Sequence, residues 1–282
     1  MLLIIQLDNI LSTFNLTYRE DPMITAEMQK QYGRDGYIKI SKGIEAKELK
    51  SFAVLLRERM VELNPNTEPL ELRSTYKSAF TQVTNLWRQS EAVRDFVLRR
   101  DLAEMAAQIM GVRGVRLYHD QALFKEAGGG PTPWHVDQVY WPLDTVNTCT
   151  FWIPLQDTPA DMGTLSFASG SHLSTGGRDM VISDESEAFF SNYVQEAGFD
   201  VSTDEFELGD ISVHAGWTVH KAGPNLTDVQ REVMTIIYMA DDTHLLRSPS
   251  QTQLVDRDAF TPGMQPGQLI DTDLNPIIFK GN

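Results

Sequence analysis

Two histidines and one aspartate have the residue types and the spacing of a metal site. One residue separates His135 from Asp137, and residues two apart in a strand project from the same face, so an imidazole and a carboxylate can reach one ion. The best candidate for a third ligand is His220, which follows a strand-like run and a short turn. Two histidines and one carboxylate on one face leave part of an octahedron open, as in non-haem iron(II) oxygenases. We therefore predict that these three residues bind iron(II) and form the catalytic centre.

Arg231 is the candidate for binding a co-substrate. It lies eleven positions after His220, at the start of a strand-like run. An arginine that faces the interior of a barrel is costly unless a carboxylate meets it, and a dicarboxylate co-substrate would provide one. The alternative is an arginine that pairs with an acid at the surface. His214 competes with His220 as the distal metal ligand, and the spacing from His220 to Arg231 favours His220.

Further residues near the motif are weaker candidates for the pocket. Gln121 and Tyr118 lie on the strand-like run before a glycine-rich turn, where they would contact the co-substrate or the substrate, or else belong to the rim or the core. Trp152 is a candidate pocket wall, although an aromatic residue in an apolar strand is more often core. Lys125 is a candidate anion contact, but a solvated lysine is the commoner case. We assign Gln121 and Trp152, together with Arg231, to co-substrate binding. The aromatic residues beside the motif form either a substrate wall or a loop packed on the barrel: Trp134, Tyr140 and Trp141.

Helical periodicity dominates the part of the chain before the motif. The predicted helices span residues 24–33, 45–63 and 91–110. The apolar face of the second helix comprises Leu49, Phe52, Ala53, Leu56, Met60 and Val61. Thr25 and Ser90 are candidate N-caps, and Gly111 ends the third helix. The first 23 residues have the character of an irregular or loosely docked arm.

The pattern changes after Gly111 to short runs of β-branched and aromatic residues between turns. The predicted strands here span residues 115–125, 148–155, 164–168, 210–214 and 232–239, and one earlier strand is predicted at residues 37–40, between the first two helices. This pattern is typical of a mainly β fold with flanking helices, in which a closed or double-sheet core carries the N-terminal helices on the outside of one sheet. We expect one domain over residues 1–282, with a helical part to residue 110, a β core over residues 111–245 and a C-terminal extension from residue 246. The polar segment 171–202 is a candidate insertion or lid.

Charge and composition exclude several classes of partner. The formal net charge is -15, which disfavours nucleic acid and anionic membrane surfaces, because both require clustered basic residues. The apolar start of the chain lacks the basic region of a signal peptide, and Asp8 interrupts it. Cys149 is the only cysteine, so the chain has no intramolecular disulfide. We expect a cytoplasmic protein that acts on a small molecule; the oligomeric state does not follow from these features.

Together these residues resemble the phytanoyl-CoA dioxygenase family. The resemblance rests on the His-x-Asp pair, the segment 163–172, the Gly-Asp strand that leads to His220, and Arg231, and it covers roughly residues 30–245. It implies a double-stranded β-helix, a jelly-roll or cupin-like core, and an oxidoreductase that uses iron(II), 2-oxoglutarate and O2 and releases succinate and CO2. It also implies that His135, Asp137 and His220 bind the iron and that Arg231 binds the distal carboxylate of 2-oxoglutarate.

Two positions depart from the pattern of many family members. Val136 replaces a glutamine within the His-x-Asp motif, and Ala222 replaces a serine or glycine two positions after the distal histidine. Either change bears on how the co-substrate is held, and neither removes a metal ligand. The halogenating relatives have a small residue in place of the carboxylate, so the presence of Asp137 favours hydroxylation or a related oxidation over halogenation.

Two other functions are kept as alternatives. A cupin-type metal enzyme would not use 2-oxoglutarate and would not need Arg231. A fatty acyl-CoA hydroxylase would need a basic cluster to bind the CoA phosphates, and the sequence places none. We therefore expect oxidation of a smaller organic molecule, as in secondary metabolism.

Overall fold

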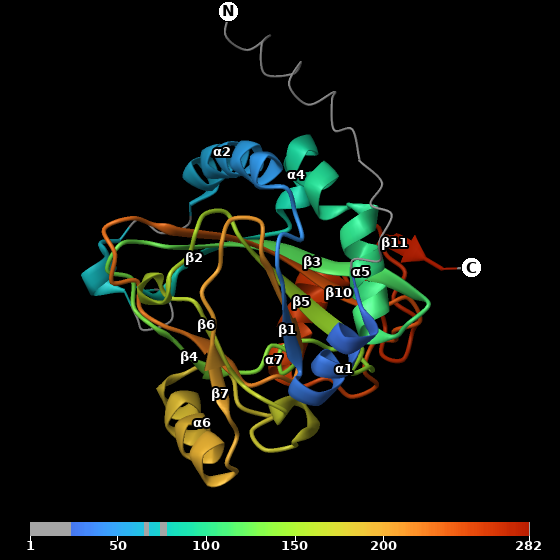
Figure 1. Cartoon of the computed structure of the whole chain (residues 1–282). Coiled ribbons are helices and arrows are strands. Elements are labelled where there is room, and N and C mark those ends of the chain that lie inside the picture. Colours follow the sequence, from blue (N-terminus) through green and yellow to red (C-terminus); the bar gives the residue numbers. More distant parts are fainter. Residues whose placement is uncertain (1–23, 65–67, 74–77, 282) are drawn as a thin grey trace, which may run out of the picture.

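Two antiparallel sheets form the centre of the molecule (Figure 1). The structure is a computed structural model that describes residues 24–64, 68–73 and 78–281. The predicted N-terminal arm lies outside the described residues. The larger sheet has the strand order β1-β8-β5-β10-β3-β11, with β2 paired to β3, and the smaller sheet has the order β4-β9-β6-β7. This arrangement confirms the predicted mainly β, double-stranded β-helix fold with flanking helices.

The six predicted strand ranges each match an observed strand to within one residue at either end, whereas the other observed strands were not among the predicted ranges. Those of the larger sheet are β1 Tyr37–Ile40, β2 Thr81–Thr84, β3 Gly114–Lys125, β5 Thr148–Pro154, β8 Ile211–Ala215, β10 Arg231–Ala240 and β11 Ile277–Lys280. Those of the smaller sheet are β4 Thr132–His135, β6 Leu165–Ala168, β7 Val201–Thr203 and β9 His220–Ala222. The larger sheet thus includes β1, β2 and β11, which lie outside residues 111–245. The division of the chain at residues 110 and 245 stays a prediction.

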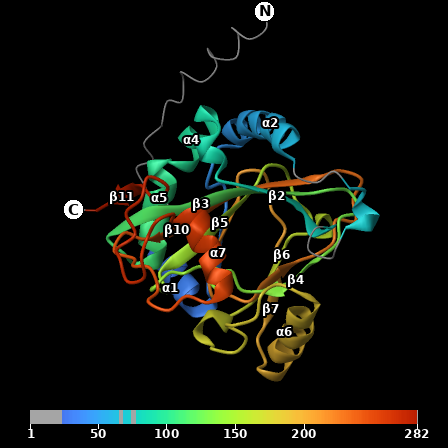
Figure 2. The ribbon, with the colours of Figure 1, turned by 180° about the vertical axis from the view of Figure 1, so that it is seen from behind.

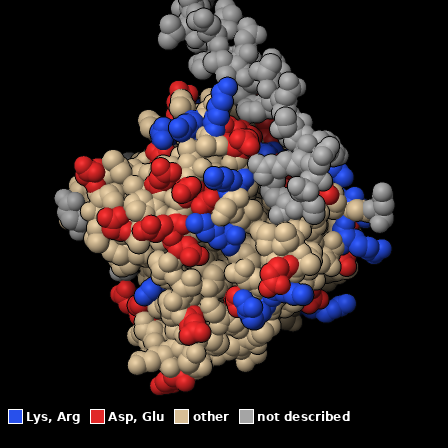
Figure 3. All heavy atoms as spheres, viewed as in Figure 1, with Lys and Arg blue, Asp and Glu red and all other residues tan. Residues whose placement is uncertain are grey.

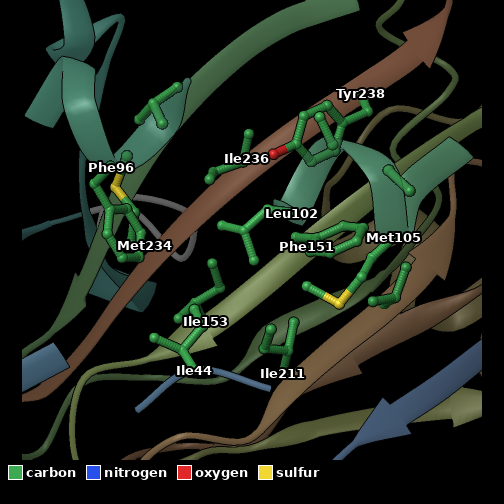
Figure 4. Packing of buried hydrophobic residues seen from close by; sticks show 14 of the residues in the cluster. Ile44, Phe96, Leu102, Met105, Phe151, Ile153, Ile211, Met234, Ile236 and Tyr238 are labelled. Carbon is green, nitrogen blue, oxygen red and sulfur yellow. The ribbon is translucent and has the colours of Figure 1, made fainter. Parts of the chain in front are cut away.

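The N-terminal helices cover the outer face of the larger sheet, as expected (Figure 1). They are α1 Ala26–Asp35, α2 Ala46–Leu63, α4 Glu91–Val97 and α5 Arg100–Met110. In Figure 4, Leu102 and Met105 of α5 lie among buried side chains of the central strands, such as Phe151. Burial of such side chains stabilises the fold by roughly 1.5–3 kcal/mol each. The core therefore occupies one face of the larger sheet and leaves the other face for a site.

Three details of the predicted helices were right and two were wrong. Thr25 and Ser90 cap α1 and α4 through their side chains, and Gly111 ends α5 in the left-handed conformation. The helix predicted over residues 91–110 is two helices, because the backbone at Arg99 is extended and its guanidinium pairs with Asp101. Val61 is 82% exposed and does not belong to the apolar face of α2.

Two further helices occur, one between strands of the β core and one after the core. The structure has α6 Asp184–Glu196 within the segment 171–202 and α7 Gln251–Phe260 after the core, and it has short 3-10 helices at Leu70–Leu72, Leu86–Arg88, Ala160–Met162 and Ser171–Leu173. In the view of Figure 2, α7 crosses in front of the larger sheet. The sequence analysis missed α7, although Ser250 and Gln253 form a capping box at its start.

Acidic and basic side chains are intermixed on the face shown in Figure 3. No helix within the described residues has the length and apolar character needed to cross a membrane.

Candidate metal and co-substrate site

Two short strands of the smaller sheet bring the histidines together. His135 is the last residue of β4, His220 is the first residue of β9, and the two are paired in the antiparallel register. The centroids of their rings are 4.1 Å apart. Asp137 lies two positions beyond the end of β4, so the expectation that it shares a strand face with His135 is wrong. A bend beyond the strand brings its carboxylate to the same point.

Contacts between two turns hold this bend in place. The backbone N–H of Gln138 donates to the carbonyl of Gly216 at 2.9 Å, and the hydroxyl of Thr148 donates to Oε1 of Gln138. Gly216 starts the turn that leads to His220. The bend that carries Asp137 is therefore anchored to the turn that leads to His220.

The two histidines have the tautomer that a metal requires. Nδ1 of His135 is 2.7 Å from the carbonyl of Pro133, and Nδ1 of His220 is 2.9 Å from the carbonyl of Thr218. A carbonyl accepts only, so both Nδ1 atoms carry the proton and both Nε2 atoms present a lone pair. These Nε2 atoms lie 3.6 Å and 3.7 Å from Oδ1 of Asp137.

The second oxygen of Asp137 is already hydrogen-bonded. Thr150 donates to Oδ2 at 2.9 Å, and Nε2 of His214 lies 3.2 Å from the same atom. Oδ1 is thereby left to face the two histidines. Within the described residues, the side-chain cluster with metal-ligand geometry comprises His135, Asp137 and His220, with ligand atoms within 4.8 Å of one another. His214 is excluded from this cluster because it contacts the outer oxygen.

Protonation states also fit a metal site. Burial alone would raise the pKa of Asp137, but His220 and then His214 hold that pKa well below its usual range. Burial lowers the pKa of His220 well below its ordinary value, and the other histidines add to the effect. The carboxylate is therefore ionised and the imidazoles are neutral, which is the state in which these groups bind a divalent metal.

Arg231 is buried in the same cavity and lacks a charged partner among the described residues. It is 2% exposed, Nη1 donates to the carbonyl of Gly163 at 2.6 Å, and Nε has no hydrogen-bond partner. Its guanidinium lies 5.5 Å from the ring of Trp152. Burial lowers the pKa of Arg231 to about 9. A buried guanidinium with a free donor fits a carboxylate ligand such as the distal group of 2-oxoglutarate.

Lys125 is buried opposite Arg231, and the preference for a solvated lysine is wrong. The two residues are directly paired between β3 and β10, and Nζ of Lys125 donates to the carbonyl of Gly130. Burial, with a smaller contribution from Arg231, lowers the pKa of Lys125 to about 6. The neutral amine avoids a second buried cation beside the guanidinium.

One cavity of about 420 Å³ contains the metal-ligand candidates and Arg231. Gln121 and Trp152 line it, and Gln121 accepts a hydrogen bond from Gln82 at 2.5 Å. Tyr140 and Trp141 line it as well, whereas Trp134 packs in another cluster. Tyr118 is not among its lining residues, and its ring packs instead against the rings of Trp141 and Phe260.

The sequence analysis missed several lining residues. His119 lies two positions before Gln121, so the alternation along β3 was a signal that could have identified it. Thr150 was missed, and His214 was considered only as a metal ligand; the two lie on neighbouring strands and meet Asp137 only in the folded chain. Asp256 and Phe260 of α7 also line the cavity, and no motif in the sequence connects them to it.

Known proteins resemble the chain in sequence and in fold. Residues 32–233 match the phytanoyl-CoA dioxygenase family. A curated relative from Stutzerimonas stutzeri, described as a probable alpha-ketoglutarate-dependent hypophosphite dioxygenase, is 24% identical over 232 residues, or 77% of this chain and 79% of that protein. Alpha-ketoglutarate is another name for 2-oxoglutarate.

Two solved structures from nogalamycin biosynthesis share the fold. The non-heme alpha ketoglutarate dependent carbocyclase SnoK has a TM-score of 0.76 and 23% identity, over 91% of this chain and 97% of that chain. The epimerase SnoN, in complex with Fe3+, alpha ketoglutarate and nogalamycin RO, has a TM-score of 0.74 and 24% identity, over 90% of this chain and 98% of that chain. With the matched span covering most of the chain, the protein belongs to the phytanoyl-CoA dioxygenase family of iron- and 2-oxoglutarate-dependent oxygenases.

Proposed function

We propose that His135, Asp137 and His220 bind iron(II), that Arg231 binds the distal carboxylate of 2-oxoglutarate, and that the enzyme oxidises a small organic molecule. One observation carries the proposal. The three ligand atoms converge within 4.8 Å in the cavity that also contains a buried arginine with an unpartnered Nε. A metal triad and a free guanidinium in one enclosed space are what a metal-chelating dicarboxylate requires.

Bound iron(II), with 2-oxoglutarate and O2, supplies an oxidation that is coupled to release of succinate and CO2. The residues of the chain orient and protect this chemistry. The carbonyls of Pro133 and Thr218 fix the rings of the two histidines, and Thr150 and His214 fix the carboxylate of Asp137. The apolar and aromatic walls exclude water from the reacting atoms.

Gln121 and Trp152 are proposed to complete the co-substrate site. Trp152 is 2% exposed and covers the guanidinium of Arg231, which keeps that group dry and strengthens its attraction for a carboxylate. Gln121 is the next cavity-facing residue after His119 on β3, and its Oε1 accepts a hydrogen bond from Nε2 of Gln82. Its amide Nε2 is then the group that would donate to a carboxylate oxygen.

An anaerobic titration tests this assignment. Addition of iron(II) and 2-oxoglutarate to the protein should produce a weak visible charge-transfer band, and aerobic incubation should release succinate. His135→Ala and Asp137→Ala should each remove the band and the succinate. A protein that binds iron without the band, or that oxidises substrates without forming succinate, would instead be the cupin-type enzyme.

The substrate is proposed to be a small organic molecule of secondary metabolism rather than a fatty acyl-CoA. SnoK and SnoN, which share the fold, belong to the biosynthesis of nogalamycin. Arg231 is the only arginine or lysine that lines the described cavity, and it lies at the proposed co-substrate end, which leaves no cavity-lining cation for CoA phosphates. Saturable turnover of an acyl-CoA would contradict this choice. A cytoplasmic location, suggested by the single buried cysteine, is part of the same proposal.

A further inference from the structure

The cavity has two ends that differ in charge. On β3, three alternate residues line the cavity: Leu123, Gln121 and His119. Lys125, which is paired with Arg231, lies two positions beyond Leu123 and therefore six positions from His119, or about 20 Å along the strand. His119 is paired with Ile237, and Ile237 is paired with Thr150, which binds Asp137. The metal-ligand candidates therefore lie beside the part of β3 that contains His119. The backbone of Arg231 lies beside the opposite end of β3, at Lys125.

Helix α7 closes the cavity beyond His119. Phe260 stacks on the ring of His119, with centroids 4.1 Å apart and planes at 15°. Asp256, one turn earlier on the same helix, lines the cavity, and its Oδ2 accepts a hydrogen bond of 3.4 Å from Tyr118. Tyr140 and Trp141 are the other aromatic residues that line the cavity near this helix. We call this region, formed by His119, Tyr140, Trp141, Asp256 and Phe260, the helix end.

The helix end contains one carboxylate and no cation that faces it. Asp137 and Asp256 are the only carboxylates that line the described cavity, and Arg231 is its only arginine or lysine. Arg257, the neighbour of Asp256, pairs instead with Asp258 at 2.7 Å. Burial raises the pKa of Asp256 to about 7, which reflects a carboxylate whose partners in the protein do not compensate its charge.

The charges in the cavity indicate the charge of the substrate group that binds at the helix end. Iron(II) and Arg231 together offset Asp137 and the two carboxylates of 2-oxoglutarate, so the loaded centre is neutral. His119 is neutral as well, because burial lowers its pKa to about 4. Asp256 is the one carboxyl group lining the described cavity that remains without a cationic partner. A carboxylate beside several aromatic rings is the environment that binds an ammonium group, because the ring faces also attract a cation.

We propose that Asp256 binds a positively charged amine of the substrate, that Tyr140 and Trp141 pack against a ring of the substrate, and hence that the enzyme oxidises a ring-containing amine. This inference rests on the proposed function, since it takes the metal and 2-oxoglutarate to occupy the other end. The buried Nδ1 of His119, which has no hydrogen-bond partner, offers a second polar contact at the same end. Anionic substrates of similar shape would be repelled by Asp256, so the same residue also determines specificity.

Calorimetric titration of the anaerobic protein loaded with iron(II) and 2-oxoglutarate tests the inference. The ligands are tryptamine, tryptophol and indolepropionate, which share an indole ring and differ in the charge of the side chain. The wild-type protein should bind tryptamine about tenfold more tightly than tryptophol, and indolepropionate least. Asp256→Asn should weaken tryptamine binding about tenfold and leave tryptophol binding within about twofold.

Asp258→Asn is the matched control, because Asp258 lies on the same helix and its side chain is 69% exposed. It should leave all three affinities unchanged. The inference is overturned if the wild-type protein does not bind tryptamine, or if Asp256→Asn keeps the preference for the amine. The charge-transfer band distinguishes this outcome from failure of the proposed function. A normal band without a preference for the amine rejects only the role of Asp256. An absent band in the wild-type protein rejects the proposed function.

Discussion

His214 and Asp137 are 77 positions apart in the chain, and Nε2 of His214 lies 3.2 Å from Oδ2 of Asp137. Because a carboxylate accepts only, Nε2 carries the proton, and the buried Nδ1 of His214 is left without a hydrogen-bond partner. His214 therefore orients the carboxylate instead of competing with His220. Such supporting contacts typically affect metal affinity by ten- to a hundredfold.

Replacement of His214 by alanine should weaken iron(II) binding about tenfold, since only Thr150 would then hold Oδ2. Competition with a chromophoric chelator measures this affinity without any need for turnover. His172→Ala is the control, because His172 does not line the cavity. Two results would contradict the positioning role. An unchanged iron(II) affinity would show that His214 only packs beside the site, and a complete loss of iron binding would show that it is a metal ligand.

Arg231→Lys should raise the KM for 2-oxoglutarate by at least about tenfold and leave iron(II) affinity unchanged. Lysine keeps a charge but cannot form the paired hydrogen bonds of a guanidinium, and burial favours its neutral form. Initial rates of succinate release at varied 2-oxoglutarate give the KM. Arg57→Lys is the control, because Arg57 pairs with Glu232, the next residue on β10, on the outside of the cavity. An equal rise in both variants would point to damage of β10.

Asp120 should make stability depend on pH. It is fully buried and accepts hydrogen bonds from the backbone N–H groups of Leu86 at 3.0 Å and Trp87 at 3.5 Å, yet burial raises its pKa from the ordinary value of 3.8 to about 7. The folded state therefore binds more protons than the unfolded state between these values. The contribution of Asp120 to stability is present at acid pH and is lost as the pH rises through about 7.

The variant Asp120→Asn removes this titration while its amide oxygen still accepts from Leu86. Its unfolding free energy, relative to the wild type, should improve by about 2 kcal/mol between about pH 5 and pH 8. Urea unfolding at the two pH values measures the change. Asp95→Asn, at an exposed position, should show no such difference. The same relative stability of Asp120→Asn at both pH values would show that Asp120 is ionised throughout.

Ser250→Ala should loosen α7 and with it the helix end of the cavity. The Ser250 hydroxyl accepts from the backbone N–H of Gln253 at 3.3 Å, and Oε1 of Gln253 accepts from the backbone N–H of Ser250 at 2.9 Å. Loss of an N-cap costs about 1 kcal/mol, which corresponds to about fivefold faster hydrogen exchange in α7. Exchange measured by mass spectrometry should change in this helix only. Thr25→Ala, which removes the cap of α1, should leave α7 unaffected.

The sequence by itself determined the class of the site. Ligand chemistry belongs to side-chain types, so His135, Asp137, His220 and Arg231, taken together with the family resemblance, predicted a metal triad with a co-substrate arginine, and these residues do line one cavity. Strand alternation and helix caps are local properties, which is why most elements of the sheet and the caps at Thr25 and Ser90 were predicted within a few residues.

Only the tertiary structure determined which other residues surround the metal-ligand candidates and Arg231. Lys125 has no local signal for burial, and its place opposite Arg231 results from the pairing of β3 with β10. His214 and Thr150 meet Asp137 because β5 and β8 are neighbours in the sheet. Asp256 reaches the cavity on a helix more than a hundred residues after the motif. Such contacts depend on long-range strand register and on helix docking, and these follow from the packing of the whole chain rather than from any short segment.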